Sequence, residues 1–443
     1  MNSSSTTPYQ PLVSSSEIRL LLLMPGSTDS PIQCSLVHTK IGENPYEALS
    51  YEWGTSQSNE PSIYIFDASC QALRMEYKGL SRFWLNKVRI HPSNPTGQIS
   101  GAPRQVRHNL YHALSRIRLE HKERCLWVDA LCIDQANHGE RTHQVEMMGK
   151  IYQSAERVIA WLGEGNENDV LAMDTFRKII ASSGWGRQDH PVISIGRNGN
   201  VKNGVDVLRV QAIVDWGSKS YWHRLWIVQE LVLAKDLLVI VGRESITGKE
   251  LDSTMVALEP FAVLIAGDSA TKLMGRTLTE RWKNILAFPL LLARQKSSIK
   301  TSMSLDGPGG RGLCDWMLRC SDSECMDPRD RVYGLLGVSE DITNLEEAQV
   351  AIEVDYEKTL LEVYCDVARF WAARNGRSMT NSALGIGLRK HFNLRSSDIR
   401  SAKDEIEKAF YMGRRVWATK KFPDLVNFPN RLERTIRDTG YVS

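Results

Sequence analysis

Residues Leu126–Gly163 read LWVDALCIDQANHGERTHQVEMMGKIYQSAERVIAWLG, and this stretch decides which fold class the sequence predicts. Two short apolar runs, Leu126–Val128 and Val158–Leu162, have the length and composition of buried strands. Between them, apolar residues from Val145 onward recur at the spacing of one helix face. The order strand, loop, helix, strand is a βαβ unit, and the loop after its first strand begins at an acid, Asp129.

The segments on either side of this unit continue the alternation of strands and helices. Ile18–Met24, Glu47–Tyr51 and Leu237–Val241 have the composition and length of strands. Gln105–Glu120 is expected to be an amphipathic helix whose basic residues form a solvated face, and Tyr221–Ala234 a strongly apolar helix. We therefore expect an α/β domain with a mainly parallel sheet and right-handed crossovers.

The pattern changes near residue 250, where we expect a boundary between two regions. The first 16 residues are polar and predict a disordered tail, which is followed by the α/β domain over residues 17–250. Helical patterns dominate residues 251–443, so the second region is expected to be mostly α-helical.

Composition excludes several classes of protein. The 443 residues include 55 basic and 52 acidic side chains, and a net charge of +3 gives no reason to expect a nucleic-acid partner. No run reaches the ~18 apolar residues that a membrane span requires. The polar start has no signal-peptide pattern, so the eight cysteines are expected to be reduced thiols in a cytoplasmic protein. The His and Cys spacings match no tetrahedral site, and we expect no bound metal.

A first candidate cluster, Ser50-Tyr51-Glu52-Trp53-Gly54, ends one of the predicted strands. Small, hydroxylated and aromatic residues followed by glycine allow a backbone to approach a ligand closely. The same residues would also suit an ordinary turn in which Trp53 anchors the core.

A second candidate is Asp129, which ends the strand Leu126–Val128 and is followed by Asp134 and Gln135. The carboxyl edge of an open α/β sheet is where ligands bind. An acid in this place can equally cap the N-terminus of a nearby helix. The residues alone do not separate the two interpretations.

A third candidate is Glu230, which follows Gln229 in the predicted apolar helix. Its neighbours one helical turn away on each side, Trp226, Ile227, Leu233 and Ala234, are all apolar. A carboxylate there loses solvation and needs a partner, and acids of this kind are enriched at functional sites. The alternative is a buried ion pair with Arg224 or with a distant arginine such as Arg331.

Three boxes of residues, taken together, resemble the fungal heterokaryon incompatibility (HET) domain family. Tyr46–Gly54 matches its Y-x-A-L-S-Y-x-W-G box. Leu126–Gln135 and Trp161–Gly163 match an L-W-[IV]-D-x-[LI]-C-I-[ND]-Q box and a W-L-G ending, and Arg224–Glu230 matches R-x-W-x-x-Q-E. The resemblance covers roughly residues 17–250. Many members run well past this length, so the C-terminal region is expected to be short or truncated.

HET domains in turn resemble TIR domains, which implies a TIR-like or flavodoxin-like fold. In NAD-cleaving TIR proteins a glutamate on a comparable helix is catalytic, and the resemblance implies this role for Glu230. One carboxylate is enough chemistry, because it stabilises an oxocarbenium-like centre while nicotinamide leaves as a neutral base. The residues that the resemblance implies for substrate binding are Ser50, Tyr51, Trp53, Asp129, Arg224, Trp226 and Gln229.

The resemblance implies a protein of fungal nonself recognition and regulated cell death, with NAD+ as a substrate and no other cofactor. The alternative is a non-catalytic signalling module that works by self-association or by contact with another incompatibility protein. A third, weaker hypothesis is an enzyme that modifies a small metabolite. The sequence leaves open whether the protein is an enzyme. A shared nucleotide site would require Tyr51, Asp129 and Glu230 to lie within about 10–12 Å of one another.

Overall fold

The chain forms two compact units in the computed structural model, and each unit draws on separate parts of the sequence. The sheet unit comprises residues 1–144, 151–221 and 234–286, whereas the helical unit comprises residues 145–150, 222–233 and 287–443. The single boundary near residue 250 stays a prediction. The structure describes residues 9–66, 101–181, 193–195, 201–265, 277, 312–343, 351–401 and 403–421.

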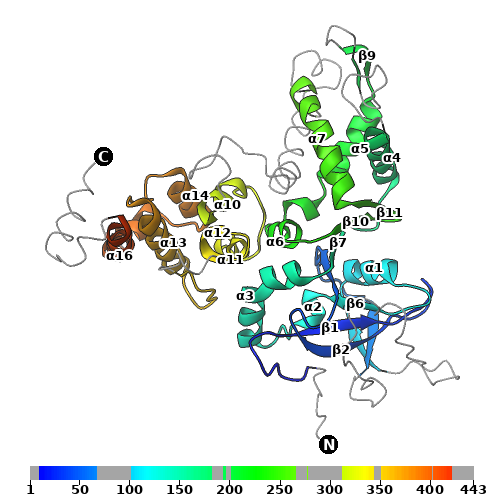
Figure 1. Ribbon diagram of the computed structural model, residues 1–443, viewed down its shortest axis with the longest axis horizontal. Coiled ribbons are helices and arrows are strands. Elements are labelled where there is room, and N and C mark those ends of the chain that lie inside the picture. The colour runs from blue at the N-terminus through cyan, green and yellow to red at the C-terminus, as the bar shows by residue number, and fades with distance from the viewer. Residues whose placement is uncertain are drawn as a thin grey trace, which may run out of the picture. The chain divides into compact units, whose positions relative to one another are not determined.

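A nine-stranded sheet, drawn in Figure 1, is the framework of the sheet unit within the described ranges. In spatial order its strands are β11 (Glu244–Thr247), β10 (Leu237–Val241), β7 (Arg157–Trp161), β3 (Glu47–Tyr51), β6 (Arg124–Trp127), β1 (Glu17–Leu23), β2 (Gln33–Lys40), β4 (Ser62–Phe66) and β5 (Ala102–Gln105). The sheet and its intervening helices confirm the predicted α/β class.

The sheet is mixed, which differs from the mainly parallel sheet that the sequence predicted. The central strands β10, β7, β3 and β6 are parallel, but β1 is antiparallel to both β6 and β2, and β11 is antiparallel to β10. Connection length explains the β10–β11 pair, because the chain turns between them through only Gly242 and Arg243, with Gly242 at φ +55°. Parallel neighbours need a longer crossover. The TIR-like or flavodoxin-like topology stays a prediction.

The βαβ unit predicted from Leu126–Gly163 is confirmed. Strand β6 leads through the short helix α2 (Asp129–Cys132) into α3 (His138–Ser154), and the chain then returns as β7. The side chain of Asn137 caps α3 by accepting a hydrogen bond from the backbone nitrogen of Glu140 at 3.1 Å. Strand β3 lies between β6 and β7 and is parallel to both, so the carboxyl ends of the three strands meet at one edge.

Helix α1 (His108–Ile117) buries the apolar residues that predicted it. The prediction of a solvated basic face is correct for Arg116, which is exposed, and wrong for Arg118. Arg118, at its C-terminus, is buried and donates hydrogen bonds to the backbone carbonyls of Ser27, Ser30 and Pro31. Burial lowers the pKa of Arg118. The arginine therefore ties α1 to the turn after β1.

The remaining elements of the sheet unit lie after β7. They are α4 (Glu167–Ala181), a hairpin of β8 (Ile193–Ile195) and β9 (Val201–Val205), α5 (Val207–Gly217) and α7 (Gly248–Ile265). A 3-10 turn (Ser220–His223) begins in the sheet unit and ends in the helical unit. Helix α4 packs against α5, α7 and β11 (Figure 1).

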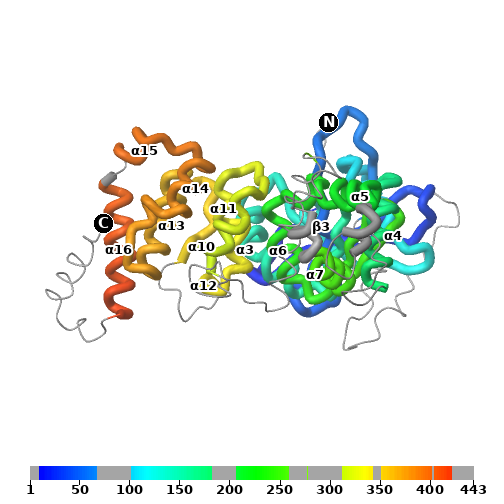
Figure 2. Tube along the Cα trace, turned by 90° about the horizontal axis from the view of Figure 1, so that it is seen from above, coloured from blue at the N-terminus to red at the C-terminus, as the bar shows by residue number. Residues whose placement is uncertain are grey.

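The helical unit contains α6 and, from residue 312 onward, regular elements that are all helices among the described residues. They are α6 (Ile227–Val232), α10 (Leu313–Arg319), α11 (Asp330–Leu336), α12 (Glu340–Thr343), α13 (Leu360–Asn375), α14 (Ala383–His391), α15 (Ser396–Ser401) and α16 (Lys403–Lys421). Leu225 and Val228 of the α6 segment belong to the same hydrophobic core as α10, α11, α13 and α14. Helices α13 and α16 lie side by side in Figure 1 and Figure 2.

The single apolar helix predicted at Tyr221–Ala234 is wrong in one respect. A 3-10 turn ends at His223 and α6 begins at Ile227, with Arg224 and Leu225 outside both. The backbone nitrogen of Leu225 donates to the carbonyl of Glu324 at 2.8 Å, which forms an isolated parallel bridge. This long-range pairing takes the backbone out of helical geometry, and local periodicity cannot reveal it.

Residues 9–16, which the sequence assigned to a disordered tail, contact the sheet unit. The Tyr9 hydroxyl donates to the carbonyl of Leu131 at 3.2 Å, and the guanidinium of Arg19 lies 4.9 Å from the Tyr9 ring. Arg19 is 1% exposed and forms a two-pronged ion pair with Glu140, with N–O distances of 2.5 and 2.9 Å. This pair links β1 to the first turn of α3.

Replacing Arg19 with methionine should destabilise the protein by about 3–5 kcal/mol, because Glu140 would keep a buried and unpaired charge. Arg177→Met is the matched control, since Arg177 pairs with Glu244 at the surface and exposed pairs contribute about 1 kcal/mol or less. Urea unfolding measures both free energies. Equal losses in the two variants would contradict the special role of Arg19.

Candidate functional site

The carboxyl edge of β3 and β6 brings together two of the predicted site residues. The indole nitrogen of Trp53 donates to Oδ2 of Asp129 at 2.8 Å. Oδ1 of Asp129 accepts from the backbone nitrogen of Ala130 at 2.7 Å, so the acid also stabilises the start of α2. The guanidinium of Arg107 lies 5.5 Å from the Trp53 ring. The bond to Ala130 agrees with a structural role for Asp129 at the start of α2, and ligand binding by Asp129 stays a prediction. Trp53 is half-buried and fixed in place rather than a core anchor.

Ser50 and Tyr51 lie one step earlier, inside β3, and both are buried. The Ser50 hydroxyl is 2.6 Å from the hydroxyl of Tyr221. Glu52, the next residue, accepts a hydrogen bond from the Ser220 hydroxyl at 2.5 Å. The end of β3 is therefore linked by polar contacts to the 3-10 turn at residues 220–223.

Sequence reasoning missed Asn109, Tyr221 and Arg107 at this edge. Asn109 donates to the carbonyl of Glu52 at 2.6 Å and accepts from the indole of Trp161 at 2.8 Å, so it connects the ends of β3 and β7. The available signal was a polar side chain in the first turn of an amphipathic helix, next to the buried Leu110. Its partners are more than 50 positions away, and the signal does not identify them.

The other predicted site residues, Arg224, Trp226, Gln229 and Glu230, belong to the helical unit. The indole of Trp226 donates to Oδ2 of Asp330, the first residue of α11, at 3.1 Å. Oδ1 of Asp330 accepts from the Tyr356 hydroxyl at 2.7 Å. Together with the backbone pairing of Leu225 with Glu324, these bonds connect the residues just before α6 to residues about 100 positions further along the chain.

Glu230 is buried, and its partner is the nearer of the two arginines that the sequence offered. Arg224 Nη1 lies 3.9 Å from Glu230 Oε2, and the Glu230 side chain is 3% exposed. Arg331 instead donates to the carbonyl of Ser321 at 2.9 Å. The Arg224–Glu230 distance is longer than a hydrogen bond, so this contact is a charge interaction.

Gln229 fills a narrow junction between α3, α6 and the end of α11. A Cβ added to Gly337 would lie 2.5 Å from Gln229 Oε1 and 3.1 Å from the Cα of Gly149. The Gln229 amide points toward the carbonyl of Tyr333, at 3.4 Å. These contacts are structural, and they account for the buried position of Gln229 without a ligand.

Asp330, the hydrogen-bond partner of Trp226, has a pKa well above its usual range. Burial raises its pKa from 3.8 to about 6, against the effect of the hydrogen bonds from Tyr356 and Trp226. Asp327 adds to the rise and Arg329 opposes it. The side chain is 7% exposed. A carboxyl group that titrates near neutral pH therefore contacts the segment that carries Glu230.

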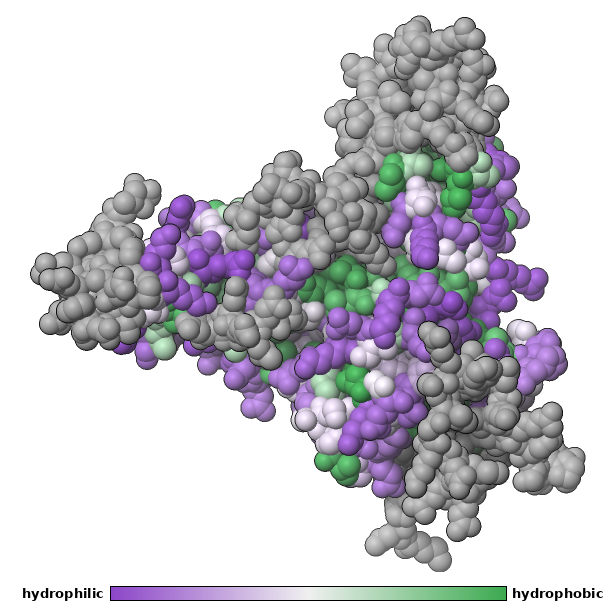
Figure 3. Space-filling view, viewed as in Figure 1, coloured by the Kyte–Doolittle hydropathy of each residue, from purple (hydrophilic) through white to green (hydrophobic). Residues whose placement is uncertain are grey.

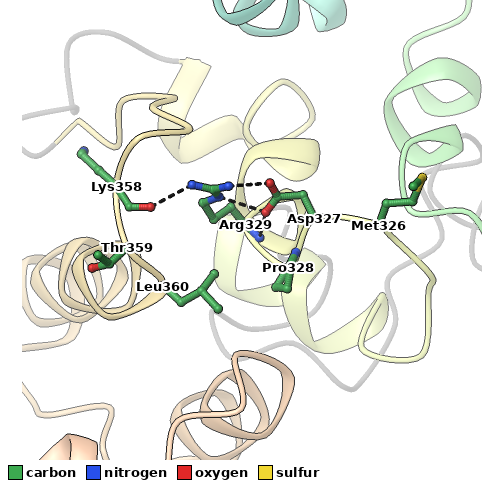
Figure 4. A pocket seen from close by; sticks show the side chains of 7 residues that line it. All are labelled: Met326, Asp327, Pro328, Arg329, Lys358, Thr359 and Leu360. Atoms are coloured by element: carbon green, nitrogen blue, oxygen red, sulfur yellow. Dashed lines mark hydrogen bonds and ion pairs between the residues drawn. The ribbon is translucent and has the colours of Figure 1, made fainter.

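A pocket of about 450 Å³ lies in the helical unit, in front of the first turn of α13 (Figure 4). Arg329 crosses it and makes two hydrogen bonds to Asp327, at 2.9 and 2.7 Å, and one to the carbonyl of Lys358 at 2.9 Å. The Lys358 amine donates to Asp366 at 2.8 Å. The charged groups of the pocket thus join the start of α11 to the start of α13.

The structure therefore assigns the predicted site residues to two groups. Trp53 and Asp129 are in direct contact, and Ser50 and Tyr51 lie in the adjoining strand, all in the sheet unit. Arg224, Trp226, Gln229 and Glu230 form the second group, in the helical unit. A shared pocket for Tyr51, Asp129 and Glu230 stays a prediction.

Three further properties concern metal binding, thiol reactivity and membrane crossing. Within the described ranges, no cluster of three or more His, Cys, Asp or Glu side chains is arranged to hold a metal ion. Burial raises the pKa of the Cys34, Cys125 and Cys132 thiols to about 12, which keeps them protonated and unreactive. None of the described helices combines the length and apolar character that a membrane crossing requires.

Comparison with known proteins finds a family match for part of the chain. Residues 46–230 match the family described as heterokaryon incompatibility protein (HET). The chain is also similar to Heterokaryon incompatibility protein 6, OR allele, of Neurospora crassa. The two are 24% identical over 425 residues, which cover 84% of this chain and 54% of the relative, so the chain spans about half the relative's length. No solved structure matches the chain, and the likeness to TIR domains stays a prediction.

Gly337→Ala should destabilise the protein by about 1–3 kcal/mol, because the added methyl group overpacks the junction at Gln229 and Gly149. The matched control is Gly387→Ala in α14, where an added Cβ meets nothing within 4 Å. Alanine is the better helix former, so the control should gain up to ~1 kcal/mol. Thermal unfolding compares the two variants. If both gain stability, the junction is not tightly packed.

The free energy of unfolding should change with pH because the pKa of Asp330 is raised in the folded state. The folded state binds its proton more tightly than the unfolded chain, so its stabilising contribution is complete below pH ~4 and is lost as the pH rises through 6. A rise of about two pKa units corresponds to ~3 kcal/mol. The wild-type free energy of unfolding should therefore fall, relative to that of Asp330→Asn, between pH 4 and 7 in urea titrations. A constant difference across this range would rule out the shift.

Proposed function

We propose that this HET-domain protein acts in fungal nonself recognition, and that it does so by cleaving the nicotinamide–ribose bond of NAD+ with Glu230 as the catalytic residue. The HET domain and the similarity to an incompatibility protein support the recognition role. The observation that carries the chemistry is a glutamate with a 3% exposed side chain, 3.9 Å from an arginine, at the end of the family match.

The reaction needs little from the protein beyond one well-placed negative charge. When the C–N bond breaks, its electron pair returns to the pyridinium nitrogen, so nicotinamide leaves as a neutral base. The ribose carbon becomes oxocarbenium-like, and a carboxylate stabilises it most strongly where water is excluded. Water then bonds to this carbon and loses a proton to solvent. The guanidinium of Arg224, 3.9 Å from Glu230, lies close enough for a charge interaction with this carboxyl group.

The family resemblance also implies substrate-binding roles for two side chains of the sheet unit. Trp53 is half-buried and is fixed by its bond to Asp129, and an indole face can stack on an aromatic ring. Asp129 is placed at the carboxyl edge of the parallel strands, where ribose hydroxyls are commonly bound in α/β folds. These roles are part of the proposal and follow from chemistry and from the family resemblance.

Glu230→Gln should lower nicotinamide release by about 100-fold or more, because the isosteric amide removes the charge that stabilises the transition state. The measurement is chromatographic detection of nicotinamide from purified full-length chain incubated with NAD+. Glu324→Gln is the matched control, since Glu324 is exposed and its contacts to His223 and Leu225 are made by its backbone.

The proposal fails if wild type and Glu230→Gln release nicotinamide at the same rate. It also fails if the wild type shows no turnover at any protein concentration, including concentrations at which it self-associates. Circular dichroism of each variant shows whether a loss of activity reflects a loss of the fold.

A second candidate function is a non-catalytic assembly module, which one observation favours. Val170, Leu208 and Val256, on helices α4, α5 and α7, are 52%, 75% and 43% exposed. Figure 3 shows hydrophobic residues among hydrophilic ones over this group of helices. In this case Glu230→Gln would retain full toxicity when overexpressed in a fungal host.

A further inference from the structure

The segment that carries Glu230 depends on distant residues for its position. Helix α6 spans six residues, and a helix this short gains little stability from its own hydrogen bonds. The chain enters α6 from the backbone pairing of Leu225 with Glu324, and the indole of Trp226 then bonds to Asp330. Trp226 is four residues before Glu230, and the backbone nitrogen of Glu230 donates to the carbonyl of Trp226 at 3.4 Å, so one turn of backbone connects the two residues.

Asp330 is the residue in which these contacts meet. One carboxylate oxygen accepts from Trp226 at 3.1 Å, and the other accepts from the hydroxyl of Tyr356 at 2.7 Å. Tyr356 is itself held, because its ring packs edge-on against Tyr333 at 5.4 Å and lies 5.4 Å from the guanidinium of Arg329. The carboxyl group therefore joins the α6 segment to the chain that leads into α13.

A simple capping role does not account for this arrangement. The start of α11 is already stabilised by Asp327, whose Oδ1 accepts from the backbone nitrogen of Arg329 at 2.9 Å. Asp330 instead directs its two oxygens to side chains of two other segments. An ionised carboxylate accepts both bonds at once, and each is stronger than a bond between neutral groups.

We propose that Asp330 is a positioning residue, which acts through Trp226 to hold the Arg224–Glu230 segment in the geometry that catalysis requires. The catalytic part of this inference rests on the proposed function, whereas the contact between Asp330 and Trp226 does not. On this basis the C-terminal helices control the activity of a residue that belongs to the HET domain by sequence.

The ionisation of Asp330 gives the contact a measurable signature. The charged and titratable groups that act on Asp330 are Asp327 and Arg329 from its own turn and Tyr356 from the segment before α13, while α6 presents the indole of Trp226. When Asp330 takes up a proton, the bond from the indole N–H changes from a charge-assisted bond to a weaker neutral one. The indole proton resonance of Trp226 should follow this change.

The test is an NMR titration of the full chain labelled with ¹⁵N-tryptophan between pH 4.5 and 8. The chain has 12 tryptophans, and Trp226→Phe identifies the indole signal of Trp226. In the wild type this signal should shift with one midpoint near pH 6. In Asp330→Asn it should be displaced and should no longer titrate, whereas in Asp366→Asn, where the lost acid pairs with Lys358 and Arg369, it should titrate as in the wild type.

Tyr356→Phe provides a second variant that does not depend on Asp330→Asn folding normally. It removes a hydrogen bond that favours the ionised carboxylate, so the midpoint of the Trp226 signal should rise by one pH unit or more. If the position and the titration of the Trp226 signal are unchanged in both Asp330→Asn and Tyr356→Phe, the proposal is overturned.

Nicotinamide release tests the part of the proposal that concerns catalysis. Asp330→Asn should lower kcat about tenfold with KM nearly unchanged, and Asp330→Glu should recover part of this loss, because a displaced Glu230 affects the transition state more than binding. An unchanged kcat in Asp330→Asn, with a displaced Trp226 signal, would overturn the positioning role. If the wild type releases no nicotinamide, the proposed function fails, and the indole titration alone upholds or overturns the Asp330–Trp226 contact.

Discussion

The pairing of the 223–226 segment with Glu324 and Asp330 is the constraint on which the helical unit depends. It divides what would otherwise be one apolar helix into a 3-10 turn and α6, and it brings Leu225 and Val228 into the core formed with α10, α11, α13 and α14. Because the contact joins residues 104 positions apart, the last residues of the HET match fold as part of the C-terminal helices. The family domain and the compact unit are therefore different sets of residues.

Buried polar groups have the same joining role in the sheet unit. Arg19 ties β1 to α3 through Glu140, Arg118 ties α1 to the turn after β1, and Asn109 links the ends of β3 and β7. Each of these groups is hydrogen-bonded, because a buried charge or amide without partners would cost several kcal/mol. At the edge that carries Trp53 and Asp129, the hydrogen bond between these two side chains holds the indole in place, which suits a site that binds a ligand in one orientation.

The contacts of Glu230 differ in kind from those of its neighbours Gln229 and Trp226. A buried carboxylate 3.9 Å from a guanidinium suits the stabilisation of a positive centre, whereas Gln229 and Trp226 make packing and hydrogen-bond contacts within the helical unit. The R-x-W-x-x-Q-E box therefore includes two residues with structural contacts, and a role of either in substrate binding stays a prediction. Similarity of sequence alone does not separate these roles, because both kinds of residue produce the same pattern.

The sequence by itself determined the elements whose causes are local. Apolar runs identified β3, β7 and β10 closely, and helical spacing identified α1 and α3, because side-chain periodicity reflects which face of an element is buried. It also placed Trp53 and Asp129 each at the end of a strand, whereas their contact comes from the structure. Only the tertiary structure decided that β1 runs antiparallel, that residues 221–234 are not one helix and that Asp330 contacts Trp226. Each of these depends on hydrogen bonds between segments far apart in the chain, and such pairing leaves no periodic trace in the sequence.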